Sequence, residues 1–383
     1  MSGKNVSPRK LPEPARSPRR EATIACGAIL VSLAAALTAC APITAPPELP
    51  ASTPAFSALE ARVASGEFGN VHSILVYHAG APIEERYFSG ADARRLLPLG
   101  NVAFTADELH DCRSVTKTVV ALLVGIALQE GKIASLDAPV LDSFPELSDL
   151  RTPAGLRLRL PHLLTMTSGI AWDEVDPPYE DARNMERMMD AAPDRYRYVL
   201  EQPVVHDPGE KWNYSGGDVA LTAAIVERGV GEKIDAYAAR ELFAPLGIAQ
   251  FEWVKDRTGT PLAASGLRLT PRGMARIGLL IAQHGQWSGR QIVPRAWIDA
   301  MTSPQITVGG PMRYGYFTWL SAILANGAPP APYAAGFGYG GQMLVVFPEE
   351  DLIVVSTAGN YGDPRFNKWA MALIGAAHAA AAD

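Results

Sequence analysis

The sequence predicts an α+β fold in which an antiparallel sheet, built from the two ends of the folded part, is flanked by helices. Runs rich in β-branched and aromatic residues near 72–88 and 342–357 indicate two hairpins. Between them, proline-free apolar stretches such as residues 115–129 favour helices. The chain has 383 residues, of which 48% are hydrophobic and 19% charged, so it is long enough to bury a sizeable core.

The first 40 residues have the pattern of a secretory signal. Six Lys and Arg residues lie in residues 1–20, and an apolar run follows at 24–37, which is short for a bilayer span. The run ends in LTAC, which resembles the bacterial lipobox. That resemblance implies cleavage before Cys40 and a lipid anchor on its sulfur, which would hold the protein in the bacterial cell envelope. A membrane-spanning helix is the alternative.

A proline-rich tether is expected at residues 41–55, because five prolines there disfavour helix and sheet. The folded domain would then span 56–383. We expect its α/β lobe at about 56–130 and 265–383, and an inserted, mainly helical lobe at about 131–264. Within these lobes the sequence predicts strands at 72–78, 83–88, 342–347 and 352–357, and helices at 115–129, 218–228, 234–242, from Thr270-Pro271 onward, and at 368–380.

Charge and cysteine usage exclude several classes of function. The formal net charge is -6, and no Lys/Arg-rich block occurs beyond the N-terminus, so a nucleic-acid partner is not expected. The three cysteines form no CxxC pair, and the seven histidines show no HxxxH or HxH spacing, so no metal site is predicted. Cys112 is expected to be a buried packing residue, with a catalytic thiol as the alternative.

The tetrad SVTK at residues 114–117 is the central chemical signal. Positions i and i+3 share a helix face, so the Ser114 hydroxyl and the Lys117 amine can meet. A serine hydroxyl needs a base, and a lysine can serve if burial lowers its pKa. The alternative is an N-cap serine beside a solvated lysine. The same pattern occurs at Ser7–Lys10, inside the leader, which shows how weak the tetrad is alone.

Two glycine-containing segments complete the pattern. Residues 212–217 (WNYSGG) predict a tight loop whose Tyr214 could pass a proton between the base, the nucleophile and the leaving group. Residues 336–342 (GFGYGGQ) match G-x-G-x-x-G formally but lead into a strand, so a dinucleotide site is rejected. Such a strand could instead offer a backbone N–H to an oxyanion.

Together, and in this order, the three segments resemble the serine β-lactamase and penicillin-binding-protein superfamily, nearest to the branch with family VIII esterases and 6-aminohexanoate-dimer hydrolase. Residues 113–118 match the first motif, 208–216 the second and the glycine run the third, and 160–169 resemble an internal landmark. The resemblance implies a β-lactamase/DD-peptidase-like fold, no cofactor, and an acyl-enzyme mechanism. Ser114 would attack, Lys117 would take its proton, Tyr214 would shuttle protons, and the backbone N–H groups of Ser114 and Gln342 would form the oxyanion hole.

Two departures from the family pattern bear on the substrate. Gly216 replaces the asparagine of the usual Tyr-x-Asn motif, and Tyr339 replaces the Lys or His of the third motif. A phenol is a poorer partner for a carboxylate than a cation is. We therefore expect a small ester or linear amide as substrate, with β-lactamase or DD-peptidase activity as one alternative and a non-catalytic binding or sensor module as another.

The substrate pocket is expected to include six residues near these motifs. The acidic segment 173–181 could overhang it, although a solvated loop is the simpler interpretation. The expected pocket residues are Trp172, Tyr179, Ser215, Tyr339, Gly340 and Gly341.

Overall fold

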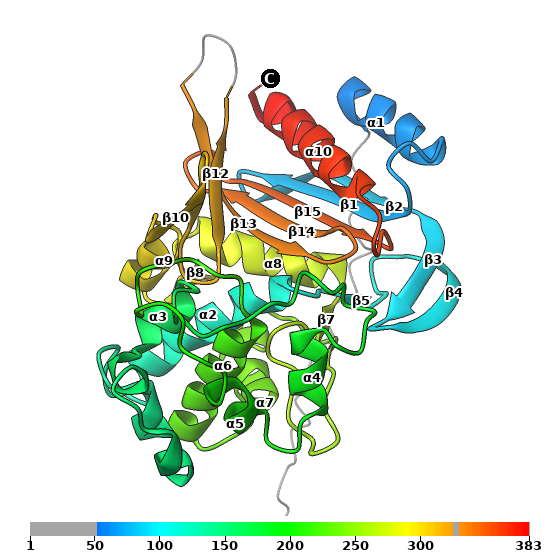
Figure 1. Cartoon of the computed structure of the whole chain (residues 1–383). Helices are drawn as coiled ribbons and strands as arrows, with labels where there is room; N and C mark the ends of the chain where they lie inside the picture. The colour runs from blue at the N-terminus through cyan, green and yellow to red at the C-terminus, as the bar shows by residue number, and fades with distance from the viewer. Residues whose placement is uncertain (1–51, 325–328, 383) are drawn as a thin grey trace, which may run out of the picture. The chain divides into compact units, whose positions relative to one another are not determined.

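An eight-stranded antiparallel sheet organises the domain in the computed structural model, which describes residues 52–324 and 329–382 (Figure 1). The strand order is β10-β11-β12-β13-β14-β15-β1-β2. The strands are β1 (Val71–His78), β2 (Ala81–Tyr87), β10 (Ile306–Gly309), β11 (Met312–Tyr314), β12 (Trp319–Ile323), β13 (Ala331–Gly338), β14 (Gln342–Phe347) and β15 (Leu352–Ala358).

The centre of this sheet joins the two ends of the domain. Strand β1 pairs antiparallel with β15, with Leu75 opposite Val355, and β15 forms a hairpin with β14. Both predicted hairpins are therefore present and lie side by side. The predicted α+β fold, with an antiparallel sheet flanked by helices and a mainly helical insertion, is confirmed.

Helices cover both faces of the sheet (Figure 1). Because side chains alternate along a strand, Leu75 points to one core and Ile74 to the other. The first core includes α8 (Pro271–Ala282), which begins at the predicted Thr270 N-cap. The second core includes α1 (Pro54–Ala64) and α10 (Arg365–Ala382), whose Trp369 is fully buried.

The region between the two halves of the sheet is mainly helical and surrounds α2 (Val115–Gln129), which has the predicted bounds. Its apolar side chains belong to the same core as α8, and residues 52–324 and 329–382 fall in one compact unit. The helices are α3 (Leu160–Leu164), α4 (Met185–Ala191), α5 (Arg195–Leu200), α6 (Gly216–Val230), α7 (Ile234–Ala238) and the π-helix η4 (Ala239–Phe243), with 3₁₀ turns η1 (Val140–Ser143), η2 (Pro145–Leu150) and η3 (Gly155–Arg157).

The described part of the chain also contains three small sheets. The most important for the site is β5-β7-β6, because β5 ends three residues before Ser114. In the first of the three sheets, β3 (Ser89–Arg94) pairs with β4 (Leu97–Ala103). In the second, β7 (Leu267–Leu269) lies between β5 (His110–Asp111) and β6 (Phe251–Trp253). In the third, β8 (Gln286–Trp287) pairs with β9 (Arg290–Gln291), and helix α9 (Arg295–Met301) follows β9.

The folded part begins earlier than the tether prediction allowed. Helix α1 starts at Pro54, and the Thr53 hydroxyl accepts a hydrogen bond from Phe56 N at the helix start. Proline suits the first helical turn because that position needs no N–H donor, so Pro54 belongs to the helix and not to an extended linker. The lipobox, Cys40 and most of the tether lie outside the described residues. Within residues 52–324 and 329–382, none of the helices combines the length and apolar character needed to cross a bilayer.

Candidate active site

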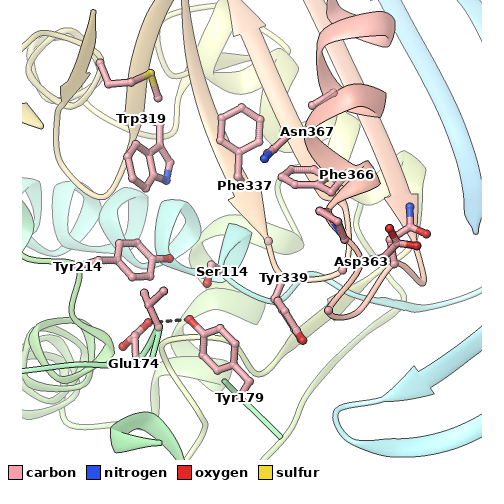
Figure 2. A pocket seen from close by; sticks show the side chains of 18 of the residues that line it. Ser114, Glu174, Tyr179, Tyr214, Trp319, Phe337, Tyr339, Asp363, Phe366 and Asn367 are labelled. Carbon is pink, nitrogen blue, oxygen red and sulfur yellow. Dashed lines mark hydrogen bonds between the residues drawn. The ribbon is translucent and has the colours of Figure 1, made fainter. Parts of the chain in front are cut away.

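A cavity of about 1060 Å³ opens between the sheet, helix α10 and the helical region, with Ser114 in its wall. Figure 2 shows Ser114, Tyr214, Glu174, Tyr179 and Tyr339 around one end of it. Most of its lining is aromatic or aliphatic, which favours ligands with apolar chains. The aromatic residues include Trp172, Trp212, Tyr214, Trp319, Phe337 and Phe366.

Ser114 occupies the N-cap position of α2, and Lys117 lies one turn further along. Lys117 Nζ is 3.0 Å from Ser114 Oγ, so the predicted meeting of the two groups occurs. The preceding residue, Arg113, has a left-handed φ of 49°, which is unusual for a residue with a Cβ and marks a sharp bend before the helix. The bend presents the hydroxyl to the cavity, at a helix terminus that favours developing negative charge.

Lys117 is buried and surrounded by acceptors. Its ammonium donates to Ala264 O at 3.0 Å and lies 3.8 Å from Glu174 Oε1. Burial opposes the charge, but the hydrogen bond with Tyr214 and the attraction of the Glu174 and Glu186 carboxylates outweigh it and raise the pKa of Lys117. This reverses the expected direction, because sequence alone cannot show that carboxylates are buried beside the amine.

Tyr214 lines the cavity beside both groups (Figure 2). The Lys117 amine lies 4.8 Å from the centre of the Tyr214 ring, and hydrogen bonds of the phenol with Ser114 and Lys117 influence its ionisation. Burial raises the pKa of Tyr214, so the phenol is neutral at physiological pH. A neutral phenol between an amine and a hydroxyl can relay a proton in either direction.

Glu174 belongs to the acidic segment 173–181, for which a solvated loop was the simpler interpretation and an overhang of the pocket the alternative. Its side chain is fully buried, and its Oε2 accepts hydrogen bonds from Trp172 Nε1, at 2.7 Å, and from Gly216 N. A Cβ on residue 216 would lie 2.7 Å from that oxygen. The glycine that replaces the usual motif asparagine therefore makes room for a carboxylate, which is a relationship that no local sequence pattern encodes.

The remainder of the segment 173–181 also contacts the site. Tyr179 lines the cavity and donates to Glu174 Oε1 at 3.1 Å, the bond drawn in Figure 2. Its ring lies 4.9 Å from that of Tyr339, whose hydroxyl donates to Glu180 Oε1 at 2.7 Å. Arg113 lies 5.7 Å from each of these two rings. The segment is thus a wall of the cavity and not only a solvated loop.

Gln342 does not reach the cavity. Its side chain is buried and forms two hydrogen bonds with the Ala358 backbone, at 2.6 and 3.2 Å, and its backbone pairs with Gly338. Gly340 and Gly341 have φ values of 91° and 104°, so the chain turns tightly after Tyr339 and carries Gln342 back into the sheet. The N–H expected at the oxyanion hole therefore lies in the β13–β14 hairpin.

The other expected pocket residues divide into two groups. Trp172, Tyr179, Tyr339 and Gly340 line the cavity. Ser215 instead caps helix α6, where its hydroxyl accepts from Asp218 N at 3.0 Å, and Gly341 lies behind the turn against Ala358. Cys112 is fully buried, and burial raises the pKa of its thiol, which fits a packing residue.

The comparisons with known proteins agree with this fold. The family model described as Beta-lactamase matches residues 60–377. The 6-aminohexanoate-dimer hydrolase of Paenarthrobacter ureafaciens is 26% identical over 286 residues, which cover 70% of each chain.

Two solved structures show the same architecture. A Bacillus anthracis protein provisionally assigned as a 6-aminohexanoate-dimer hydrolase superposes with a TM-score of 0.69 at 18% identity, covering 83% of this chain and 81% of that one. A family VIII carboxylesterase superposes with a TM-score of 0.61 at 18% identity, covering 86% and 98%.

Proposed function

The chain belongs to the β-lactamase family, and from that premise we propose that it is a serine hydrolase that cleaves a small ester or linear amide through an acyl-enzyme. The observation that carries the proposal is the 3.0 Å contact between Lys117 Nζ and Ser114 Oγ in the wall of a cavity. A hydroxyl with an adjacent amine and phenol is the arrangement that nucleophilic catalysis requires.

In the proposed reaction, Ser114 Oγ attacks the substrate carbonyl carbon while its proton passes to the uncharged form of Lys117. The bond to the leaving oxygen or nitrogen breaks as that atom receives a proton through Tyr214. Water then attacks the acyl carbon and loses one proton to Lys117 and Tyr214. The bond from the acyl carbon to Ser114 Oγ breaks as Oγ takes up a proton from these groups, which releases the acid and restores the serine hydroxyl. The resting ammonium of Lys117 must lose its proton before this cycle begins, because its pKa is raised.

We assign the oxyanion hole to the backbone N–H groups of Ser114 and Tyr339. Tyr339 follows the last residue of β13 and lines the cavity together with Ser114, whereas Gln342 does not. Backbone donors held by a helix start and a strand end are rigid, which suits them to stabilising a developing negative charge.

The charges of the residues that line the cavity favour binding of a neutral or amine-bearing substrate over binding of an anionic one. The described residues that line it include no Lys, Arg or His. Three of them are acidic, namely Asp173, Glu174 and Asp363. Burial and the hydrogen bond to Glu180 raise the pKa of Tyr339, so this phenol remains uncharged. A substrate carboxylate would therefore find no cation in this lining to bind it.

Hydrolysis of p-nitrophenyl butyrate tests the proposal. We expect Ser114→Ala to lower kcat/KM by about 10⁴-fold or more and to abolish labelling by a fluorophosphonate probe. Ser57→Ala, at an exposed position of α1, is the matched control and should behave as the wild-type chain. Undiminished labelling of the Ser114 variant would refute the assignment of the nucleophile.

The non-catalytic alternative is tested by the same assay, since ester release no faster than in buffer with Ser114 intact would favour it. β-Lactamase or DD-peptidase activity is tested with nitrocefin. We expect ester turnover to exceed nitrocefin turnover, and similar rates for both would overturn the substrate preference.

Lipid anchoring at Cys40 is a further part of the proposal, supported by the leader pattern and the LTAC sequence. Cells expressing the full chain with an alkyne-bearing fatty acid should incorporate the label into the wild-type protein and not into Cys40→Ser. Equal labelling of both chains would contradict this assignment.

A further inference from the structure

We propose that His72, Asp92 and His110 form a structural binding site for one divalent transition-metal ion, with Zn²⁺ as the ion that fits their donor set best. The three residues lie on β1, β3 and β5, and one ligand atom from each lies within 4.8 Å of the others. All three are buried, and none is among the described residues that line the Ser114 cavity.

The hydrogen bonding of His110 directs a lone pair into this cluster. His110 Nδ1 is 3.2 Å from the carbonyl oxygen of Asp111, a group that can only accept, so the ring proton is assigned to Nδ1. Nε2 then carries a lone pair, which accepts a hydrogen bond from His72 Nδ1 at 2.8 Å, and a metal ion would take the place of that proton. A histidine whose outer nitrogen donates to a backbone carbonyl is the usual arrangement of a metal ligand.

Asp92 supplies the second observation. Its side chain is 1% exposed, and its Oδ2 has no hydrogen-bond partner among the described residues, although it lies 3.6 Å from His110 Nε2. The only ion-pair partner found for this carboxylate in the described part of the chain is that histidine. A buried carboxylate oxygen without a partner is costly, and a cation between it and the two imidazoles would remove the cost.

The donor set selects the class of ion. Two imidazoles and one carboxylate suit zinc, which binds three protein ligands and leaves a fourth position for water, whereas calcium and magnesium prefer oxygen ligands alone. Around a tetrahedral zinc ion the two ligand nitrogens would be about 3.3 Å apart. The present separation of 2.8 Å is about 0.5 Å shorter, so the two rings would have to move apart to hold the ion.

The position of the cluster indicates what the ion would do. His110 belongs to the short strand β5, and Ser114 follows four residues later. Asp92 Oδ1 accepts from the Tyr361 hydroxyl at 3.2 Å, and the Tyr361 ring lies 5.7 Å from that of Tyr339. The ion would therefore join β1 to the segment before the nucleophile and to the turn that contains Tyr339, without contacting substrate.

The full-length chain, stripped with a chelator and re-equilibrated with ZnSO₄ or CoCl₂, provides the test. We expect about one zinc per chain by mass spectrometric metal analysis, and visible d–d absorption of bound Co²⁺ without a thiolate charge-transfer band. Asp92→Asn and His110→Asn should each lose most of the metal. His284→Asn, which removes a half-exposed histidine paired with Asp299, should retain it.

Results from the wild-type chain or from the variants can overturn the proposal. Failure to bind stoichiometric zinc or to show cobalt absorption would do so, and so would full metal retention by soluble, folded Asp92→Asn and His110→Asn. If either variant fails to fold, the cobalt spectrum of the wild-type chain decides, because bands of a site with nitrogen and oxygen ligands support the proposal and their absence refutes it. Neither readout depends on hydrolase activity.

Discussion

The Lys117 amine and the Glu174 carboxylate lie 3.8 Å apart in the interior, where both side chains are almost completely buried. The carboxylate is one of the groups that raise the pKa of Lys117, so the amine that must accept the Ser114 proton is charged at rest. Burial also raises the pKa of Glu174, although the lysine charge opposes this. A residue outside the three motifs thus contributes to the charge on the base.

Glu174→Gln should shift the pH profile of kcat/KM. Removing the negative charge makes the ammonium form of Lys117 less favourable and lowers its pKa, so the uncharged base becomes available at lower pH. We expect the rising limb of the profile to move down by about one pH unit. Glu210→Gln, at an exposed position, should leave it in place. A limb that stays fixed or moves upward in the Glu174 variant would contradict this role.

Gly216→Ala should reproduce part of that effect. The new methyl group would lie 2.7 Å from Glu174 Oε2 and displace the carboxylate from Lys117. The pH profile should then move in the same direction as in Glu174→Gln. In a Glu174→Ala background the same substitution should have little further effect, so a double-mutant cycle measures the coupling. Additive effects of the two changes would exclude this steric link.

Tyr339→Lys should increase activity toward anionic substrates relative to neutral esters. It places a cation at the position where the related motif carries one, beside a cavity that otherwise has acidic groups. We expect the ratio of nitrocefin to butyrate-ester turnover to rise by about 10-fold, which corresponds to ~1.4 kcal/mol. Tyr339→Phe, which removes only the hydroxyl and its bond to Glu180, should leave that ratio unchanged. Equal ratios in both variants would show that charge at this position does not set selectivity.

Two glycine substitutions should change stability in opposite directions. A Cβ on Gly125, inside α2, would lie 2.2 Å from Trp297 Cδ1, so Gly125→Ala should destabilise the fold by about 1–3 kcal/mol despite the better helix propensity of alanine. A Cβ on Gly375, inside α10, meets nothing within 4 Å, so Gly375→Ala should stabilise by about 0.5–1 kcal/mol. Urea unfolding measures both, and a stabilised Gly125 variant would contradict the packing argument.

Several features of this protein are determined by interactions between neighbours in the chain, and the amino-acid sequence alone predicts them. The tetrad at 114–117 brings Ser114 and Lys117 together because residues three apart share a helix face. The Thr270-Pro271 helix start and the β1–β2 and β14–β15 hairpins follow from local capping, turn and strand preferences. The proline-free apolar stretch at 115–129 likewise predicted the bounds of α2.

Other features depend on contacts between segments far apart in the chain, and only the tertiary structure decided them. The surroundings of Lys117 depend on Glu174 and Ala264, the absence of Gln342 from the cavity wall depends on the turn at Gly340, and the His72–Asp92–His110 cluster joins three strands. Spacing rules could not find these groups, because ionisation and ligand geometry depend on distance and burial in space, and neither is a property of sequence neighbours.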